Sequence, residues 1–133
     1  MGLVRWRNFD ACFGAGLLEA LTQVVVDHTR CVLLTCDTAY PEPLYSARPI
    51  PDSFGIGLVL APQSSATSLA QISVSFTDAR ADTLDDCALE NLRLSIPAAR
   101  GLPLLCAIAS KQNQRVVLDY LDSTRLAVVI THC

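Results

Sequence analysis

The pattern of apolar and polar residues near the start of the chain predicts a helix that leads into a buried strand. Over residues 10–26, apolar residues recur at helical spacing and form one broad face. They are Phe13, Leu17, Leu18, Leu21, Val24 and Val25. Asp10 can cap this helix with its carboxylate, and the polar residues 27–29 end it. Residues 31–36 are apolar apart from Thr35, which predicts a central strand covered on both faces, as in parallel α/β sheets.

Two glycines lie inside the predicted helix. Gly14 and Gly16 each cost about 1 kcal/mol of helix stability relative to alanine. Because glycine alone leaves room for a second backbone, we expect another segment to approach closely at this end.

Residues 37–52 form a proline-rich segment. Its four prolines exclude a helix or an inner strand and predict an ordered surface loop. The polar and aromatic residues of this loop can line a groove or contact a partner, or the loop is only a stiff connector. These residues are Tyr40, Glu42, Tyr45 and Arg48.

Residues 1–9 show no clear hydrophobic period, so both an edge strand and an arm onto a partner are compatible with them.

The remaining pattern predicts further strands and two helices. Residues 54–61 and 69–76 are expected to pair as antiparallel strands. A capping signal at 83–86 precedes a helix over 84–94 with Leu84, Cys87, Ala88 and Leu92 facing inward. A helix from Pro103 to residue 110 follows, and the strands 115–120 and 126–131 form a terminal hairpin. The prediction is one α/β domain over residues 1–133, with a mixed sheet, a buried helix and two covering helices.

Composition narrows the class of protein. Hydrophobic residues make up 51% of the 133 residues and charged residues 17%, which excludes disorder and predicts an apolar surface covered by a partner such as a second copy. The net charge of -3 and the lack of a basic cluster argue against nucleic acid as a ligand. No apolar run reaches the roughly 20 residues of a membrane span, and no signal peptide is visible, so we expect a cytoplasmic protein.

The six cysteines are accordingly expected to be thiols, and their spacing contains no CxxC pair, so no metal site is predicted. Phosphate-binding and dinucleotide-binding glycine motifs are also absent, and no cofactor is predicted. Cys12 lies at the start of the first helix, where free amides and the helix dipole stabilise a thiolate. Cys12 is a candidate nucleophile, or alternatively a small residue packed at a tight helix start. The absence of an obvious base favours the second interpretation.

The other candidate residues have structural explanations. His28 is expected at the polar end of the first helix, and His132 in the last strand, and neither position is typical of a catalytic base. Asp82, Asp85, Asp86 and Glu90 cluster at the start of a helix, where compensation of the dipole accounts for them without a metal.

Several short motifs together resemble the β-ketoacyl synthases of the thiolase superfamily. The segment from Ala11 to Gly16, the helix after it and the strand 31–36 resemble the nucleophile turn, buried helix and following strand of those enzymes. The motifs Phe13-Gly-Ala-Gly-Leu-Leu-Glu-Ala20, Tyr40-Pro-Glu-Pro-Leu44 and Pro51-Asp52-Ser-Phe54 are similar to the divergent β-ketoacyl synthase-like N-terminal domains. So are Val32-Leu-Leu and Pro103-Leu-Leu.

The resemblance implies a partial thiolase-like half-fold lacking the usual N-terminal strands. It implies a non-catalytic, chain-length-factor-like component of a fatty-acid, polyketide or aryl-polyene pigment pathway. Such a protein pairs with itself, with an active ketoacyl synthase or with an acyl carrier protein. The alternatives are a thioester-handling acyltransferase that uses Cys12, and a structural dimerisation module.

Overall fold

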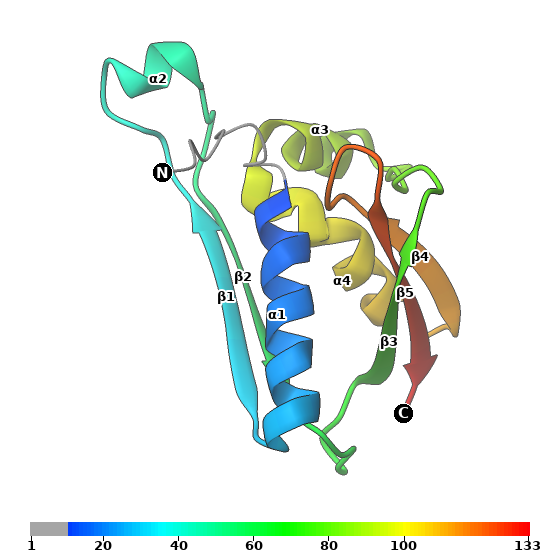
Figure 1. The fold of residues 1–133 in the computed structure, drawn as a ribbon. Coiled ribbons are helices and arrows are strands. Elements are labelled where there is room, and N and C mark those ends of the chain that lie inside the picture. Colours follow the sequence, from blue (N-terminus) through cyan, green and yellow to red (C-terminus); the bar gives the residue numbers. More distant parts are fainter. Residues whose placement is uncertain (1–10) are drawn as a thin grey trace.

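The computed structural model describes residues 11–133, in which a long helix lies between two small antiparallel sheets (Figure 1). The helices are α1 (Cys12–Asp27), α2 (Leu44–Ala47), α3 (Cys87–Ser95), the 3-10 helix η2 (Pro97–Gly101) and α4 (Leu102–Ala109). The strands are β1 (Cys31–Asp37), β2 (Phe54–Leu60), β3 (Ala70–Thr77), β4 (Gln114–Leu118) and β5 (Arg125–His132). The prediction of an α/β fold is therefore confirmed. Within the described range, no helix is long and apolar enough to cross a membrane.

The first sheet is the two-stranded hairpin of β1 and β2. These strands pair antiparallel over seven positions, from Cys31 opposite Leu60 to Asp37 opposite Phe54. The inward residues Leu33 and Ile56 are buried against α1. Alternate residues therefore face outward, away from α1.

The second sheet has the order β3-β5-β4 and is also antiparallel throughout. Its central strand β5 places Leu126, Val128 and Ile130 in the core, where none of them is exposed. The predicted terminal hairpin is confirmed, because β4 pairs with β5 from Gln114 opposite Ile130 to Leu118 opposite Leu126.

Helix α1 carries the core that joins the two sheets. Its side chains Phe13, Leu17, Ala20 and Val24 are buried at the spacing that the sequence predicts. Phe13, Leu17 and Ala20 belong to one hydrophobic cluster with residues of both sheets and of α4. Val25, predicted to face the core, is instead 67% exposed, because it points about 100° around the helix axis from its buried neighbour Val24. The helix ends at His28, which adopts the left-handed conformation with φ of 54°.

The two glycines of α1 are close to other parts of the chain, as predicted. A Cβ at position 14 would collide with the backbone carbonyl oxygen of Asp119. At position 16 the nearest atom is a methyl carbon of Leu33, 3.0 Å away. Gly14 thus brings the first turn of α1 against the segment that follows β4, and Gly16 brings the next turn against β1.

A second, smaller core lies beside η2. It consists of Ile50, Ile96, Ala99 and Leu102. The carboxylate of Asp37 at the end of β1 accepts a hydrogen bond of 2.6 Å from the amide of Ala98. This bond fixes the first turn of η2 to the end of the hairpin.

Both predicted strand arrangements before the terminal hairpin are wrong. β1 is not covered on both faces in a parallel sheet, because α1 covers one face only and leaves Val32 and Leu34 60% and 74% exposed. The single mixed sheet is replaced by two antiparallel sheets. The strands β2 and β3 do not pair with each other, since the chain between them passes the C-terminal end of α1 to reach the other sheet (Figure 1).

Several predicted boundaries also change. α3 begins at Cys87 rather than at residue 84, because the chain up to the cap residue Asp86 is not helical. Cys87 and Ala88, predicted to face inward, are exposed in the first turn of this helix. α4 begins one residue before Pro103. The prediction that residues 37–52 contain no helix is wrong, because this loop contains the four-residue helix α2, which a proline can precede without losing a hydrogen bond. The predicted cap Asp10 and residues 1–9 lie outside the described range.

We predict that Gly14→Ala destabilises the protein and that Gly16→Ala does not. The new Cβ at position 14 meets backbone atoms that cannot move independently, and overpacking of this kind should lower the free energy of unfolding by about 2 kcal/mol. At position 16 only the end of a flexible side chain must shift, and the helix gains propensity, so the change should stay within about 1 kcal/mol. Urea denaturation of both variants measures this. Equal stability of the two variants would contradict the close contact at Gly14.

Candidate functional site

The thiol of Cys12 is exposed at the first residue of α1. The neighbouring Phe13 side chain is fully buried, and its ring lies where a side chain at Gly101 would have to be. Together with the contact at Gly14, this packing fixes the first turn from the core side. Cys12 is therefore held at the N-terminus of a rigid helix, where the backbone amides and the helix dipole favour a negative charge.

His28 lies at the opposite end of α1 from Cys12. It is exposed and forms the C-cap of the helix, as the sequence predicts. A helix rises about 1.5 Å per residue, which separates the backbones of Cys12 and His28 by about 24 Å. His28 cannot accept a proton from the Cys12 thiol at this distance, because proton transfer requires hydrogen-bond reach.

His132 is also far from the first turn of α1. It lies at the end of β5, as predicted, and its Nε2 is 3.0 Å from the carbonyl oxygen of Ile108 in α4. Leu126, six residues earlier on the same strand, is the residue of β5 that contacts the Gly14 position. Six residues of extended strand span about 20 Å. The structure therefore brings neither histidine to Cys12.

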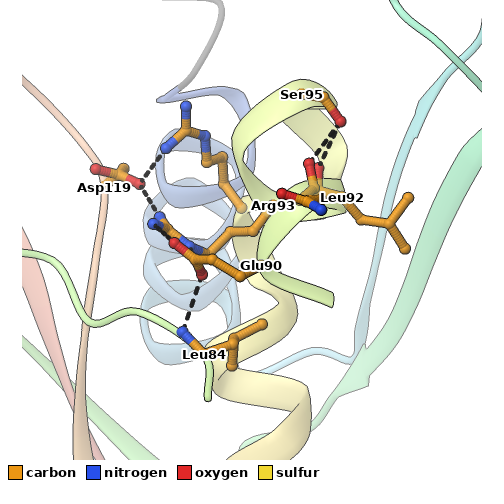
Figure 2. Close-up of polar contacts among 8 residues, drawn as sticks. Leu84, Glu90, Leu92, Arg93, Ser95 and Asp119 are labelled. Atoms are coloured by element: carbon orange, nitrogen blue, oxygen red, sulfur yellow. Dashed lines mark hydrogen bonds and ion pairs between the residues drawn. The ribbon is translucent and has the colours of Figure 1, made fainter. Parts of the chain in front are cut away.

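The structure also contains a charge cluster that the sequence patterns did not predict, formed by Glu90, Arg93, Arg100 and Asp119 (Figure 2). Arg93 contacts Glu90 twice, through Nη2 at 2.6 Å and Nε at 2.8 Å. Asp119 Oδ2 accepts from Nη1 of Arg93 at 3.2 Å and from Nη1 of Arg100 at 3.1 Å. The cluster links α3, η2 and the segment after β4.

The charges of this cluster balance each other. Arg93 is only 5% exposed, and a guanidinium at such a position needs anionic partners. The hydrogen bonds from Arg93, followed by the one from the Leu84 amide, lower the pKa of Glu90 from about 4.5 to about 2. The same Glu90 contact raises the pKa of Arg93. Two cations face two carboxylates, so the cluster stabilises the packing of α3 and η2 rather than presenting a net charge to a ligand.

The acidic residues near α3 have separate structural roles. Asp86 caps the helix, since its Oδ1 accepts from the amides of Ala88 and Leu89 at 2.9 and 3.0 Å. The predicted dipole compensation is thus confirmed for this residue. Asp82 instead pairs with the edge of β4, where its carboxylate accepts from the Val117 amide at 2.8 Å. In residues 11–133 no three metal-ligating side chains come together.

The candidate residues of the proline-rich loop are divided between core and surface. Tyr40 packs against the second core, whereas Tyr45 on α2 is 38% exposed. The carboxylate of Glu42 accepts from the amide and the hydroxyl of Ser46, at 3.2 and 2.6 Å. These contacts order the loop internally.

Part of the charge cluster has a sequence signal. Glu90 and Arg93 are three residues apart in a helix, and such pairs lie on the same face. Asp119 lies 26 residues from Arg93 and in a different element, so only the fold reveals it as the second acceptor.

Comparison of the chain with models of known protein families, with curated proteins and with solved structures gives no match. The function must therefore be inferred from the residues and their arrangement.

We predict that the contribution of Glu90 to stability is lost at acid pH. The folded pKa lies below the unfolded one, so the contribution is complete above about pH 4.5 and disappears as the pH falls toward 2. Glu90→Gln should be less stable than the wild type at pH 7, and the difference should shrink across this window. Chemical denaturation at a series of pH values measures it.

Asp85→Asn is the matched control, because Asp85 is an exposed carboxylate just before the same helix. It should differ little from the wild type at any pH. A Glu90→Gln difference that stays constant between pH 5 and pH 2 would show that the ion pair does not lower the pKa of Glu90.

Proposed function

We propose that this chain is a non-catalytic β-ketoacyl synthase-like component of a fatty-acid, polyketide or aryl-polyene pigment pathway, with a partial thiolase-like half-fold. It acts in the cytoplasm beside a partner ketoacyl synthase, a second copy of itself or an acyl carrier protein. The observation that carries this proposal is the environment of Cys12: an exposed thiol on a helix start whose other side packs on the core, with both histidines of the chain remote from the thiol.

The arrangement of α1 and β1 supports the likeness to a synthase. In the resemblance, a nucleophile turn leads into a buried helix and then into a strand. Here Cys12 opens α1, the helix is buried between two sheets, and β1 follows and packs against it. The glycines of the nucleophile-turn motif have a physical reason in this chain, since Gly14 admits the carbonyl of Asp119.

The surroundings of Cys12 support a role without condensation chemistry. A cysteine nucleophile of this kind works with a base within hydrogen-bond distance. His28 is at the far end of the helix, and His132 lies at the far end of β5, beside the carbonyl of Ile108. Asp119, whose backbone carbonyl lies against Gly14 in this turn, has its carboxylate in the balanced charge cluster. The first turn of α1 therefore serves packing.

One observation favours the alternative of a thioester-handling enzyme. The Cys12 thiol is exposed and lies at a helix N-terminus, which is where a thiolate is stabilised and can be acylated. The chain offers a matched comparison, because Cys87 is likewise exposed at the first residue of a helix, α3.

We predict that Cys12 forms no acyl-enzyme intermediate with acyl thioesters. After incubation with acyl-CoA or acylated carrier protein, intact-mass spectrometry should show no more modification of Cys12 than of Cys87, because both histidines of the chain lie far from the first turn of α1. Cys12→Ala and Cys87→Ala should behave alike. An adduct that disappears in Cys12→Ala and persists in Cys87→Ala would overturn the non-catalytic role and establish the enzyme.

The same preparations test the partner. Carrier protein and ketoacyl synthase of the same organism should be retained by the immobilised chain, and the Cys12→Ala variant should retain them equally. Retention of neither protein at high concentration would favour the structural dimerisation module over the synthase-like component.

A further inference from the structure

The two outer edges of the three-stranded sheet differ in what covers them. Along β4, the amide of Val117 donates to the Asp82 carboxylate at 2.8 Å, and the Val117 carbonyl accepts from the Asp82 amide at 2.9 Å. Along β3, no segment of residues 11–133 pairs with the outer edge. The chain therefore closes one edge of this sheet itself and leaves the other edge open.

The register of the sheet shows which backbone groups of β3 face the open edge. Just before β3, the carbonyl of Leu69 accepts from the amide of Cys133 at 3.5 Å, so Leu69 faces the central strand. Alternate residues of an antiparallel ladder bond to the same neighbour, so the odd-numbered residues of β3 bond to β5. The even-numbered residues point their amides and carbonyls toward the open edge. They are Ala70, Ile72, Val74 and Phe76.

The hydrophobic core is also incompletely covered along β3. The partners of Ile72, Val74 and Phe76 on β5 are fully buried. Ile72 and Val74 themselves are only half-buried, and Phe76 is 62% exposed. The ring of Phe76 lies beside that of Tyr120, with 5.9 Å between the ring centroids. Apolar side chains and unpaired backbone groups thus occur together at this edge.

β3 lacks the features that usually prevent an open edge from pairing. Exposed edge strands are commonly blocked by a charged residue, a proline or a bulge. Residues 63–77 contain neither a charge nor a proline, and β3 pairs with β5 over eight consecutive positions without a bulge. From this geometry we infer that the open edge of β3 binds an extended peptide segment of a partner, which adds to the sheet as a fourth strand.

The properties of the edge select this occupant. Amides and carbonyls that alternate along a strand are matched by the backbone of another strand, and an apolar ligand without such groups would bury them unpaired. The edge is eight residues long, or about 26 Å, and about 10 Å thick, which gives roughly 260 Å². A stable complex of two folded proteins buries about 800 Å² per partner. A short peptide fills this edge, whereas a second copy of the chain, with the same net charge of -3, gains too little contact to offset its repulsion.

The edge also defines the sequence of the segment. A peptide residue that bonds to Ile72 or Val74 in an antiparallel pair directs its side chain to the core face of the sheet, so it should be apolar. The residues between them lie beside the exposed Ser73 and Ser75 on the outer face, so they should be polar. The expected ligand is a strand of alternating apolar and polar residues. The inference concerns this edge only and stands independently of the synthase-like function.

A labelled peptide of alternating valine and threonine, with a lysine at each end for solubility, tests the inference. Its fluorescence anisotropy with the full chain should show saturable binding below about 1 mM. The valine amides of this peptide face β3, so N-methylation of the valines should weaken binding at least about tenfold. N-methylation of the threonines is the matched control, because their amides face away from β3. It should change the affinity by less than about threefold.

Val74→Pro tests the same contact from the protein. It removes an amide that faces the open edge and no bond to β5, so it should weaken binding at least about tenfold, whereas Val74→Thr should stay within about threefold. Urea denaturation checks that both variants fold, and the methylated peptides need no variant. Absence of saturable binding up to about 1 mM overturns the inference, as does equal binding of the two methylated peptides. A wild type that dimerises in sedimentation velocity at about 0.5 mM, unlike Val74→Pro, would assign the edge to a second copy and also overturn it.

Discussion

The structure depends on the contact between the first turn of α1 and the backbone that follows β4. Gly14 has no side chain, and the carbonyl of Asp119 occupies the space where one would be. This contact lets α1 lie directly against the three-stranded sheet while its other side packs on the hairpin. One helix consequently supplies the core of both sheets, although the sheets share no strand and no hydrogen-bonded pair.

The charge cluster reinforces the same position. Asp119 uses its backbone carbonyl against Gly14 and its carboxylate against Arg93 and Arg100. The cost of burying Arg93 is offset because Glu90 and Asp119 both accept hydrogen bonds from it. The start of α1, the helices α3 and η2 and the second sheet are thereby fixed at one point. The exposed thiol of Cys12 lies on the opposite side of this turn from the core. The packing at Phe13 and Gly14 holds the backbone of the turn in place.

Local patterns predicted much of the fold, whereas the pairing of distant segments could not be predicted. The face of α1, the close approach at Gly14 and the terminal hairpin all follow from spacing within one segment. The apolar run 31–36 looks the same whether one face or two faces of the strand are covered, so the arrangement of β1 was predicted wrongly. Asp119 shows no signal as a site residue, because its partners come from elements far away in sequence.

Native-state hydrogen exchange measures the central claim most directly. If α1 is the shared core of both sheets, it cannot open without unfolding the whole chain. The amides of Leu17 to Val24 should then exchange as slowly as those of β5, with the free energy of global unfolding. Exchange of these α1 amides through a local opening, at a free energy well below that of β5, would contradict the claim that one helix joins the two sheets.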